Sequence, residues 1–269
     1  MLQLRGLPAE HLRTVLHLAR RYDEIVGPRP LAGGVSPSRV MSAASAELQR
    51  ELHGRVIANL FFEDSTRTRV SFSVAARRLG ADVIDLTSVG SSMNKGETVV
   101  DTALNVAAMG VDGVVIRHRS SGAAEMVRRA LDGEPAHGRA EDLEPALESA
   151  VATPHEPGVL APPPCSVINA GDGRHEHPTQ GLLDIYTVAS AFERLETFDL
   201  SGLTVAIIGD IGSSRVARSD IAGMVALGAR VICIGPPGLV PAGMRTLGCE
   251  VSHDLDSVLP ELDVVNVLR

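Results

Sequence analysis

The stretch from Phe61 to Arg69, Phe-Phe-Glu-Asp-Ser-Thr-Arg-Thr-Arg, combines hydroxyls and arginines at the start of a predicted helix. Ser65 and Thr66 are good N-cap residues, and apolar residues recur at helical spacing from Val70 to Leu79. Arginine in a first helical turn faces the positive end of the helix dipole, which is unfavourable unless an anion binds there. Backbone N–H groups, hydroxyls and guanidinium groups that meet at a helix N-terminus are suited to phosphate.

A second interpretation of the same stretch needs no ligand. Glu63 and Asp64 directly precede the hydroxyls, and their carboxylates could pair with Arg67 and Arg69 on a solvated helix start. Exposed ion pairs of this kind are common and contribute little stability. The local sequence therefore leaves both a phosphate site and a simple surface cluster open.

The composition restricts the class of protein. A chain of 269 residues favours two domains over one, and a net charge of −8 argues against a general nucleic-acid binder. No apolar run has membrane-spanning length, and no signal-peptide pattern is found. We therefore expect a cytoplasmic protein that does not associate with a membrane. Cys165, Cys233 and Cys249 are expected to be reduced thiols, and without a C-x-x-C pair we expect no structural metal.

Lysine is unusually rare in this chain. Of the 25 basic residues only Lys95 is a lysine, and it lies in the Ser/Gly-rich segment from Thr87 to Gly96. A compact ammonium group on a flexible stem differs chemically from a planar guanidinium, so a retained lysine can mark a functional position. Chance retention in an ordinary surface loop is the alternative.

Strand and helix patterns alternate along the chain, with no internal repeat. Helices are expected at 4–25, 65–79, 98–109, from 178 onward and up to 227, and strands at 55–62, 82–86, 113–116, from 167, and at 203–209, 230–235 and 263–268. This order predicts an α/β fold with two domains, each a mostly parallel sheet flanked by helices. The Pro/Ala/Glu-rich region at about 131–164, in which 141–151 can form a helix, is expected to be a surface insertion without a chemical role.

Two further motifs allow more than one interpretation. His175 and His177 could bind a metal ion, but the sequence shows no clear further ligands, which makes this a weak metal signal. Gly209 to Arg215 resembles a degenerate dinucleotide fingerprint, but the third glycine is missing, so no nicotinamide site is expected.

Phe61 to Arg69 resembles the carbamoyl-phosphate loop of the aspartate/ornithine carbamoyltransferase family, except that most members have a small residue or proline in place of Asp64. The Ser…Lys-Gly-Glu…Asp-Thr segment around Lys95 is similar to the family's mobile loop, and the spacing favours Ser91 over Ser92 as its serine. Asn169 to Gly173 with His-Pro-Thr-Gln-Gly-Leu-Leu-Asp at 177–184 resembles the carbamoyl-binding signature, in the form typical of the aspartate enzymes.

The resemblance implies a carbamoyltransferase-like fold and carbamoyl transfer from carbamoyl phosphate to L-aspartate in pyrimidine biosynthesis, without a cofactor. The family pattern implies that carbamoyl phosphate is bound by Ser65, Thr66, Arg67, Thr68, Ser91, Arg117, His177 and Gln180. It implies that aspartate is bound by Lys95, Arg215 and Arg269, and that catalysis depends on Thr68, Arg117, His177 and Lys95.

The resemblance also implies domain and subunit organisation. Residues 1–189 correspond to the carbamoyl-phosphate-binding domain and residues 190–269 to an aspartate-binding domain that is C-terminally incomplete, because family members continue past Arg269. We therefore expect this form to be weakly active or inactive. A homotrimer or a multiple of trimers with shared active sites is expected, and a regulatory or dihydroorotase partner stays open. The alternatives are a catalytically incompetent structural subunit and a carbamoyltransferase for another amino acid such as ornithine.

Overall fold

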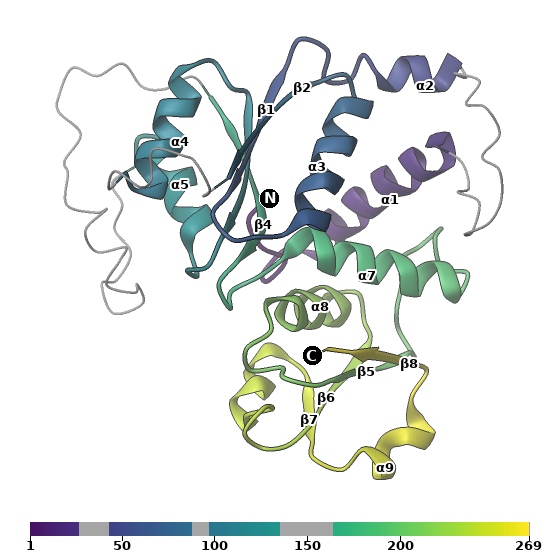
Figure 1. Ribbon diagram of the computed structural model, residues 1–269. Coiled ribbons are helices and arrows are strands. Elements are labelled where there is room, and N and C mark those ends of the chain that lie inside the picture. The colour runs from purple at the N-terminus through teal and green to yellow at the C-terminus, as the bar shows by residue number, and fades with distance from the viewer. Residues whose placement is uncertain (27–42, 88–96, 135–163, 269) are drawn as a thin grey trace. The chain divides into compact units, whose positions relative to one another are not determined.

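The computed structural model describes residues 1–26, 43–87, 97–134 and 164–268 (Figure 1). The chain forms two compact units, the first made of Met1–Leu2 and Arg29–Gly173, the second of Gln3–Pro28 and Arg174–Arg269. The helix expected at 141–151 lies outside the described residues. Within the described residues, no helix is both long enough and apolar enough to span a bilayer.

The first unit is built on a parallel sheet in the order β2-β1-β3-β4. Its strands are β1 (Val56–Phe61), β2 (Asp82–Thr87), β3 (Gly113–His118) and β4 (Ser166–Asp172). Its helices are α2 (Ala43–Leu48), α3 (Thr66–Arg78), α4 (Val99–Ala108) and α5 (Ala123–Leu131). The strands and the helices α3 and α4 agree with the expected ranges within a few residues, whereas α5 was not predicted.

The sheet of the first unit buries side chains on both faces. Leu60 and Ile116 belong to a core with residues of α4 and α5, whereas Phe61 and Val115 pack with Phe72 of α3 on the opposite face. Figure 1 shows α4 and α5 on one side of this sheet and α3 on the other. This alternation follows the two-residue period of a strand, and it fixes α3 directly beside the end of β1.

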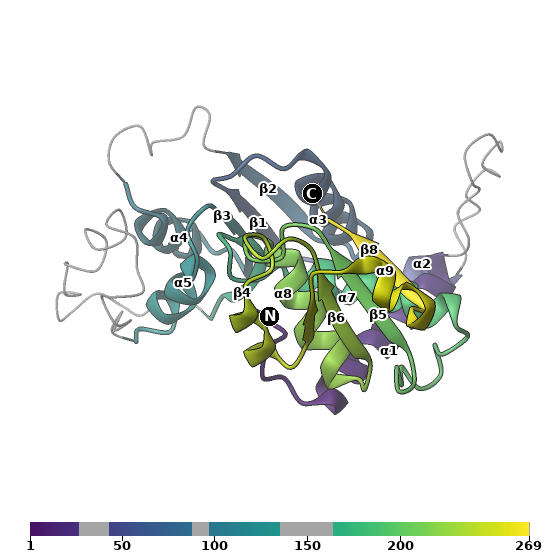
Figure 2. The ribbon, with the colours of Figure 1, turned by 90° about the horizontal axis from the view of Figure 1, so that it is seen from below.

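The second unit contains another parallel sheet, in the order β7-β6-β5-β8. Its strands are β5 (Thr204–Ile208), β6 (Arg230–Ile234), β7 (Glu250–Ser252) and β8 (Val264–Val267), and Figure 2 shows β6, β5 and β8 together. Its helices are α1 (Ala9–Val26), α7 (Pro178–Ala191), α8 (Arg215–Ala226), η3 (Ala242–Leu247), α9 (Leu255–Val258) and η4 (Leu259–Glu261). Helix α1 begins later than expected, because Pro8 precedes its first turn and has no N–H to donate.

Both faces of the second sheet are covered. Val205 and Ile207 belong to the core that includes residues of α8, α7 and α1, and Ile232 packs on the other face with Val258 and Leu262. The fold is therefore α/β, with two parallel sheets that are each flanked by helices. The compact units differ from the expected functional domains, 1–189 and 190–269, in two segments. Gln3–Pro28 with α1, and the residues from Arg174 to the end of α7, belong to the second unit, where α7 packs against α8.

Candidate active site

The N-terminus of α3 has the construction expected of an anion site. Ser65 is its N-cap with extended backbone, and the first intrahelical hydrogen bond runs from Arg69 N–H to the Ser65 carbonyl at 3.1 Å. The N–H groups of Thr66, Arg67 and Thr68 precede that bond and are the donors that every helix leaves without an intrahelical acceptor. Ser65 Oγ donates to Thr68 Oγ1 at 2.9 Å, so the two hydroxyls lie together in the same turn.

Arg117 lies at the carboxyl end of β3 with its side chain only 11% exposed. Its Nη2 donates to Glu63 Oε1 at 2.7 Å and its Nη1 to the Ala170 carbonyl at 3.0 Å. These contacts fix the guanidinium in one orientation at the sheet end where open α/β sheets bind ligands. Glu63 therefore has a partner in Arg117 of β3. The interpretation of this stretch as a local surface cluster did not include that strand.

The remaining members of that proposed surface cluster are Asp64, Arg67 and the half-buried Arg69. Asp64 and Arg67 are exposed, and within the described ranges neither Arg67 nor Arg69 makes an ion pair. The interpretation in which Arg67 and Arg69 pair with Glu63 and Asp64 is therefore wrong. An exposed, unneutralised guanidinium beside a helix N-terminus is a position that an anion would stabilise.

His118 follows Arg117 but adds little positive charge. Burial lowers the pKa of His118, and its ring packs edge-on against Phe62 with centroids 5.7 Å apart. Its Nδ1 accepts a hydrogen bond from the Ser120 N–H at 2.9 Å, which leaves the ring proton on Nε2 in the neutral form. Arg117 is thus the cationic member of the Arg-His pair.

In the second unit, His177 is held at the N-cap of α7 by its own backbone. Its N–H donates to Ser219 Oγ at 2.9 Å, and the ring is 6% exposed with Thr179 Oγ1 3.5 Å from Nδ1. Gly181 allows α8 to come this close, because a Cβ at Gly181 would lie 2.8 Å from Ser219 Cβ. The packing of α7 on α8 therefore sets where the His177 ring lies.

Glu176 is the centre of a buried network that sequence reasoning missed. Its Oε2 accepts from the Leu4 N–H at 2.6 Å and from Ser219 Oγ at 3.0 Å, and its Oε1 accepts from the Arg5 N–H at 3.1 Å. His175 beside it contacts Gln3 at 3.1 Å. Among the residues that the structure describes, no group of three or more His, Cys, Asp or Glu side chains is arranged to hold a metal ion.

Gln180 lies one turn into α7, and its Nε2 donates to Asp184 Oδ1 at 3.0 Å. Asp184 and Asp220 are close enough to influence each other, and burial raises the pKa of both carboxyls. Sequence reasoning quoted Asp184 only as part of a motif. Its spacing of four residues from Gln180 on a helix was a signal that could have predicted the contact.

Arg215 is the first residue of α8, after the N-cap Ser214, whose Oγ accepts from the Ala217 N–H at 3.1 Å. The preceding turn starts at Gly209, which has a φ of +134° and lies so close to the chain end that a Cβ would be 2.4 Å from the Leu268 carbonyl oxygen. Only glycine accepts both constraints. The predicted residues Ser91, Lys95 and Arg269 lie outside the described residues.

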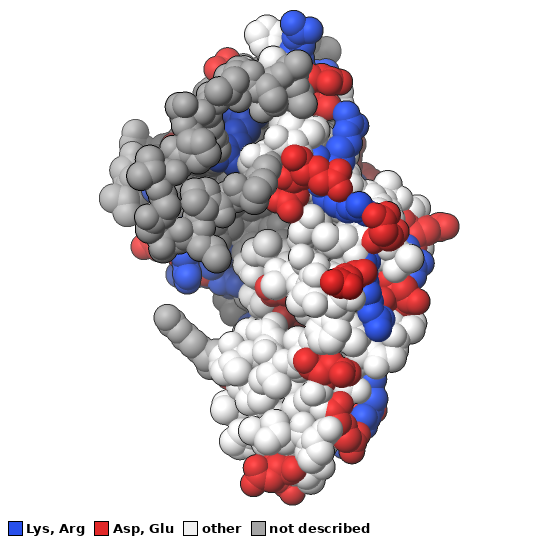
Figure 3. All heavy atoms as spheres, turned by 90° about the vertical axis from the view of Figure 1, so that its right-hand side faces the viewer, with Lys and Arg blue, Asp and Glu red and all other residues white. Residues whose placement is uncertain are grey.

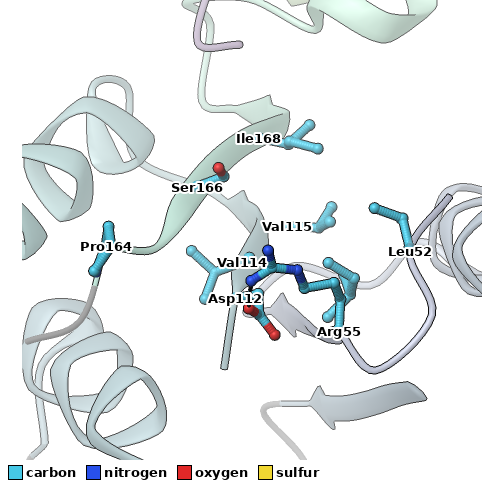
Figure 4. Close-up of a pocket in the computed structure, with 10 residues that line it drawn as sticks. Leu52, Arg55, Asp112, Val114, Val115, Pro164, Ser166 and Ile168 are labelled. Atoms are coloured by element: carbon cyan, nitrogen blue, oxygen red, sulfur yellow. Dashed lines mark hydrogen bonds and ion pairs between the residues drawn. The ribbon is translucent and has the colours of Figure 1, made fainter. Parts of the chain in front are cut away.

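The surface charge and one pocket can be compared with the position of the candidate site. On the face in Figure 3, acidic and basic side chains are intermixed, and the described residues there form no broad basic field. A pocket of about 390 Å³ in the first unit is lined by Ile57, Gly113 and Ser166 at the amino ends of their strands. Figure 4 shows this pocket with Ser166 and Arg55 among the labelled residues. Arg117 lies at the opposite edge of the same parallel sheet, so this pocket is separate from the candidate site.

The first unit is an α/β fold in which the N-terminus of α3, with two contacting hydroxyls, lies at the carboxyl edge of a parallel sheet. Residues 1–190 match the family model described as aspartate/ornithine carbamoyltransferase, carbamoyl-P binding domain. The chain belongs to the aspartate/ornithine carbamoyltransferase family.

Individual relatives agree with this assignment. The aspartate carbamoyltransferase catalytic subunit of Thermobifida fusca is 46% identical over 229 residues, which are 85% of this chain and 61% of that protein. The Myxococcus xanthus subunit is 46% identical over 218 residues, 81% of this chain and 61% of that one. The structure of Trypanosoma cruzi aspartate transcarbamoylase with carbamoyl phosphate is 27% identical, with a TM-score of 0.70 over 100% of this chain and 74% of that chain. The chain thus spans about 61% of the length of these first two relatives.

Proposed function

We propose that this protein transfers the carbamoyl group of carbamoyl phosphate to the amine of L-aspartate, giving N-carbamoyl-L-aspartate and phosphate in pyrimidine biosynthesis. The observation that carries the proposal is the α3 N-terminus, where two contacting hydroxyls, first-turn N–H groups and the exposed Arg67 occur in one turn. The names of the relatives support the choice of ligand. Residues 1–189 are proposed to bind carbamoyl phosphate and residues 190–269 to bind aspartate.

The phosphate and the reacting carbonyl need different partners. Ser65, Thr66 and Arg67 are proposed to bind the phosphate together with Ser91, and this neutralises the leaving group as its bond breaks. Thr68, Arg117 and His177 are proposed to donate to the carbonyl oxygen and to stabilise the tetrahedral oxyanion, which is typically the largest electrostatic contribution. For His177 the proposed donor is Nε2, and in the proposed tautomer the hydroxyl of Thr179, 3.5 Å from Nδ1, donates to that nitrogen.

The acceptor amine and the carbamoyl amide are proposed to have their own partners. Gln180 binds the carbamoyl amide, and Lys95, Arg215 and Arg269 bind the aspartate carboxylates, for which cationic side chains are the usual partners. Lys95 also contributes to catalysis. Holding both substrates in line could lower the barrier by about 7–11 kcal/mol, and the departing phosphate takes the proton of the amine.

The assembly follows the same proposal. We propose a cytoplasmic homotrimer, or a multiple of trimers, in which Ser91 and Lys95 complete the active site of a neighbouring subunit. A regulatory chain or a dihydroorotase is the kind of partner proposed for the larger assembly. Sedimentation of the purified protein at several concentrations measures the subunit number, and a monomer at all of them would exclude shared sites.

The phosphate half of the proposal is tested by Arg67→Ala, with Arg77→Ala in the last turn of the same helix as the matched control. Loss of a charge-assisted contact of about 1.5–3 kcal/mol should weaken carbamoyl phosphate binding by about tenfold or more. Titration calorimetry measures the affinity. Equal affinities in the two variants would contradict the phosphate site.

The acceptor half is tested by product formation. The protein is incubated with carbamoyl phosphate and either L-aspartate or L-ornithine, and the carbamoylated product is measured. Carbamoyl-aspartate as the main product is the expected result. Preference for ornithine would mean that ornithine, and not aspartate, is the acceptor substrate. Binding of carbamoyl phosphate without turnover of either acceptor would favour a catalytically incompetent structural subunit.

A further inference from the structure

Behind Gln180 lies a short chain of polar side chains that links α7, α8 and β8. Gln180 Nε2 donates to Asp184 Oδ1 at 3.0 Å, and Asn266 Nδ2 donates to Asp220 Oδ2 at 3.0 Å. Helices α7 and α8 pack on each other (Figure 1). Asp184 on α7 and Asp220 on α8 are close enough there for each carboxyl to act on the other. Two neutral amides thus flank an acidic pair.

The pair needs a proton. Asp220 is fully buried, and its Oδ1 has no hydrogen-bond donor among the described residues. A buried carboxylate oxygen without a donor is costly, and two ionised carboxylates cannot hydrogen-bond each other. Burial and the neighbouring Asp184 carboxyl raise the pKa of Asp220 well above its ordinary value. The proton belongs on the more deeply buried Asp220, which donates it to Asp184.

The protonation of the pair determines how Gln180 can lie. An ionised carboxylate is an acceptor only, so Asp184 takes an N–H from the Gln180 amide. The Gln180 carbonyl oxygen Oε1 then points away from Asp184 and can bind only a donor. We propose that Asp184 and Asp220 share one proton and act as positioning residues, holding Gln180 so that Oε1 accepts a hydrogen bond from the carbamoyl amide. For its ligand this inference rests on the proposed function.

Two substitutions separate the steps. Asp184→Asn replaces the acceptor with a group that can donate to Gln180, so the Gln180 amide is free to turn and present N–H to the carbamoyl N–H. Asp220→Asn keeps a donor for Asp184 and an acceptor for Asn266, and it removes the titrating proton. Asp256→Asn, an exposed change on α9, is the control for loss of one negative charge in the second unit.

Calorimetry with carbamoyl phosphate and with inorganic phosphate gives the readout. Asp184→Asn should weaken the binding of carbamoyl phosphate by about tenfold to a hundredfold, because donors of Gln180 and of the carbamoyl amide then face each other unpaired. The affinity for inorganic phosphate should stay the same, because that ion has no amide. Asp220→Asn should keep both affinities. In infrared spectra at neutral pH, the band of a protonated carboxyl should be present in the unmodified protein and in Asp256→Asn but absent in Asp220→Asn.

Each contrary result has a distinct meaning. Asp184→Asn with unchanged carbamoyl phosphate affinity, or with an equal loss for inorganic phosphate, overturns the positioning role. Absence of the infrared band in the unmodified protein, or an Asp220→Asn loss as large as that of Asp184→Asn, overturns the shared proton. If the unmodified protein binds neither ligand, the proposed function fails and the Gln180 step falls with it, whereas the infrared band still decides whether the pair holds a proton.

Discussion

Replacing the buried Glu176 by glutamine should destabilise the second unit by about 2 kcal/mol. The carboxylate accepts from the N–H groups of Leu4 and Arg5 and from Ser219 Oγ, and the residue is only 2% exposed. Glutamine keeps one acceptor oxygen and turns an NH2 group toward a donor, so one hydrogen bond to a charged group is lost. Such a bond contributes about 1.5–3 kcal/mol.

The chain offers a selective probe for this measurement. It has no tryptophan, and both of its tyrosines, Tyr22 and Tyr186, belong to the second unit. Urea unfolding followed by tyrosine fluorescence therefore reports the free energy of unfolding of this unit, independently of the first. Circular dichroism recorded in the same titration shows whether the first unit unfolds separately.

Two comparisons make the result decisive. Glu193→Gln, an exposed change in the same unit, should alter the free energy of unfolding by less than about 0.5 kcal/mol. A double-mutant cycle of Glu176→Gln with Ser219→Ala should show a coupling of about 0.5–3 kcal/mol, because the two side chains share a hydrogen bond. Additive effects, or a Glu176→Gln protein as stable as the Glu193→Gln protein, would refute the network as the support of His177.

Further expectations concern pH, backbone and assembly. The pKa of Asp220 is raised in the folded state above the ordinary 3.8. Its contribution to the free energy of unfolding is therefore complete below pH 3.8 and is lost as the pH rises toward the folded pKa, at about 1.4 kcal/mol per pH unit. Urea unfolding at several pH values should show this pH dependence in the unmodified protein and not in Asp220→Asn. Gly209→Ala should destabilise the second unit by more than 1 kcal/mol, roughly the cost of a strained backbone, whereas Gly238→Ala, in open space, should not; equal urea midpoints would contradict this. If active sites are shared, mixing a Lys95→Ala chain with an Arg117→Ala chain should restore part of the activity, and no recovery under demonstrated subunit exchange would count against sharing.

Local signals in the sequence predicted the elements that carry the phosphate chemistry. The strand at 55–62, the N-cap at Ser65 and the helical spacing up to Leu79 are short-range properties, and the structure has β1 and α3 there. The parallel arrangement was also predictable, because strands alternated with helices throughout. The nine-residue α5 was missed, although its apolar residues recur at helical spacing.

The partners that orient the candidate side chains could not be predicted from the sequence. Arg117 is fixed by Glu63, 54 positions away, and Glu176 by the N–H of Leu4, 172 positions away. Asp220 looks like any surface carboxylate in the sequence, and it becomes a proton-holding group only where α8 packs on α7. Residue type and spacing determined which groups are available for chemistry. Tertiary packing decided which of them are buried and which meet, because hydrogen-bond partners and pKa values depend on burial and on distance through space.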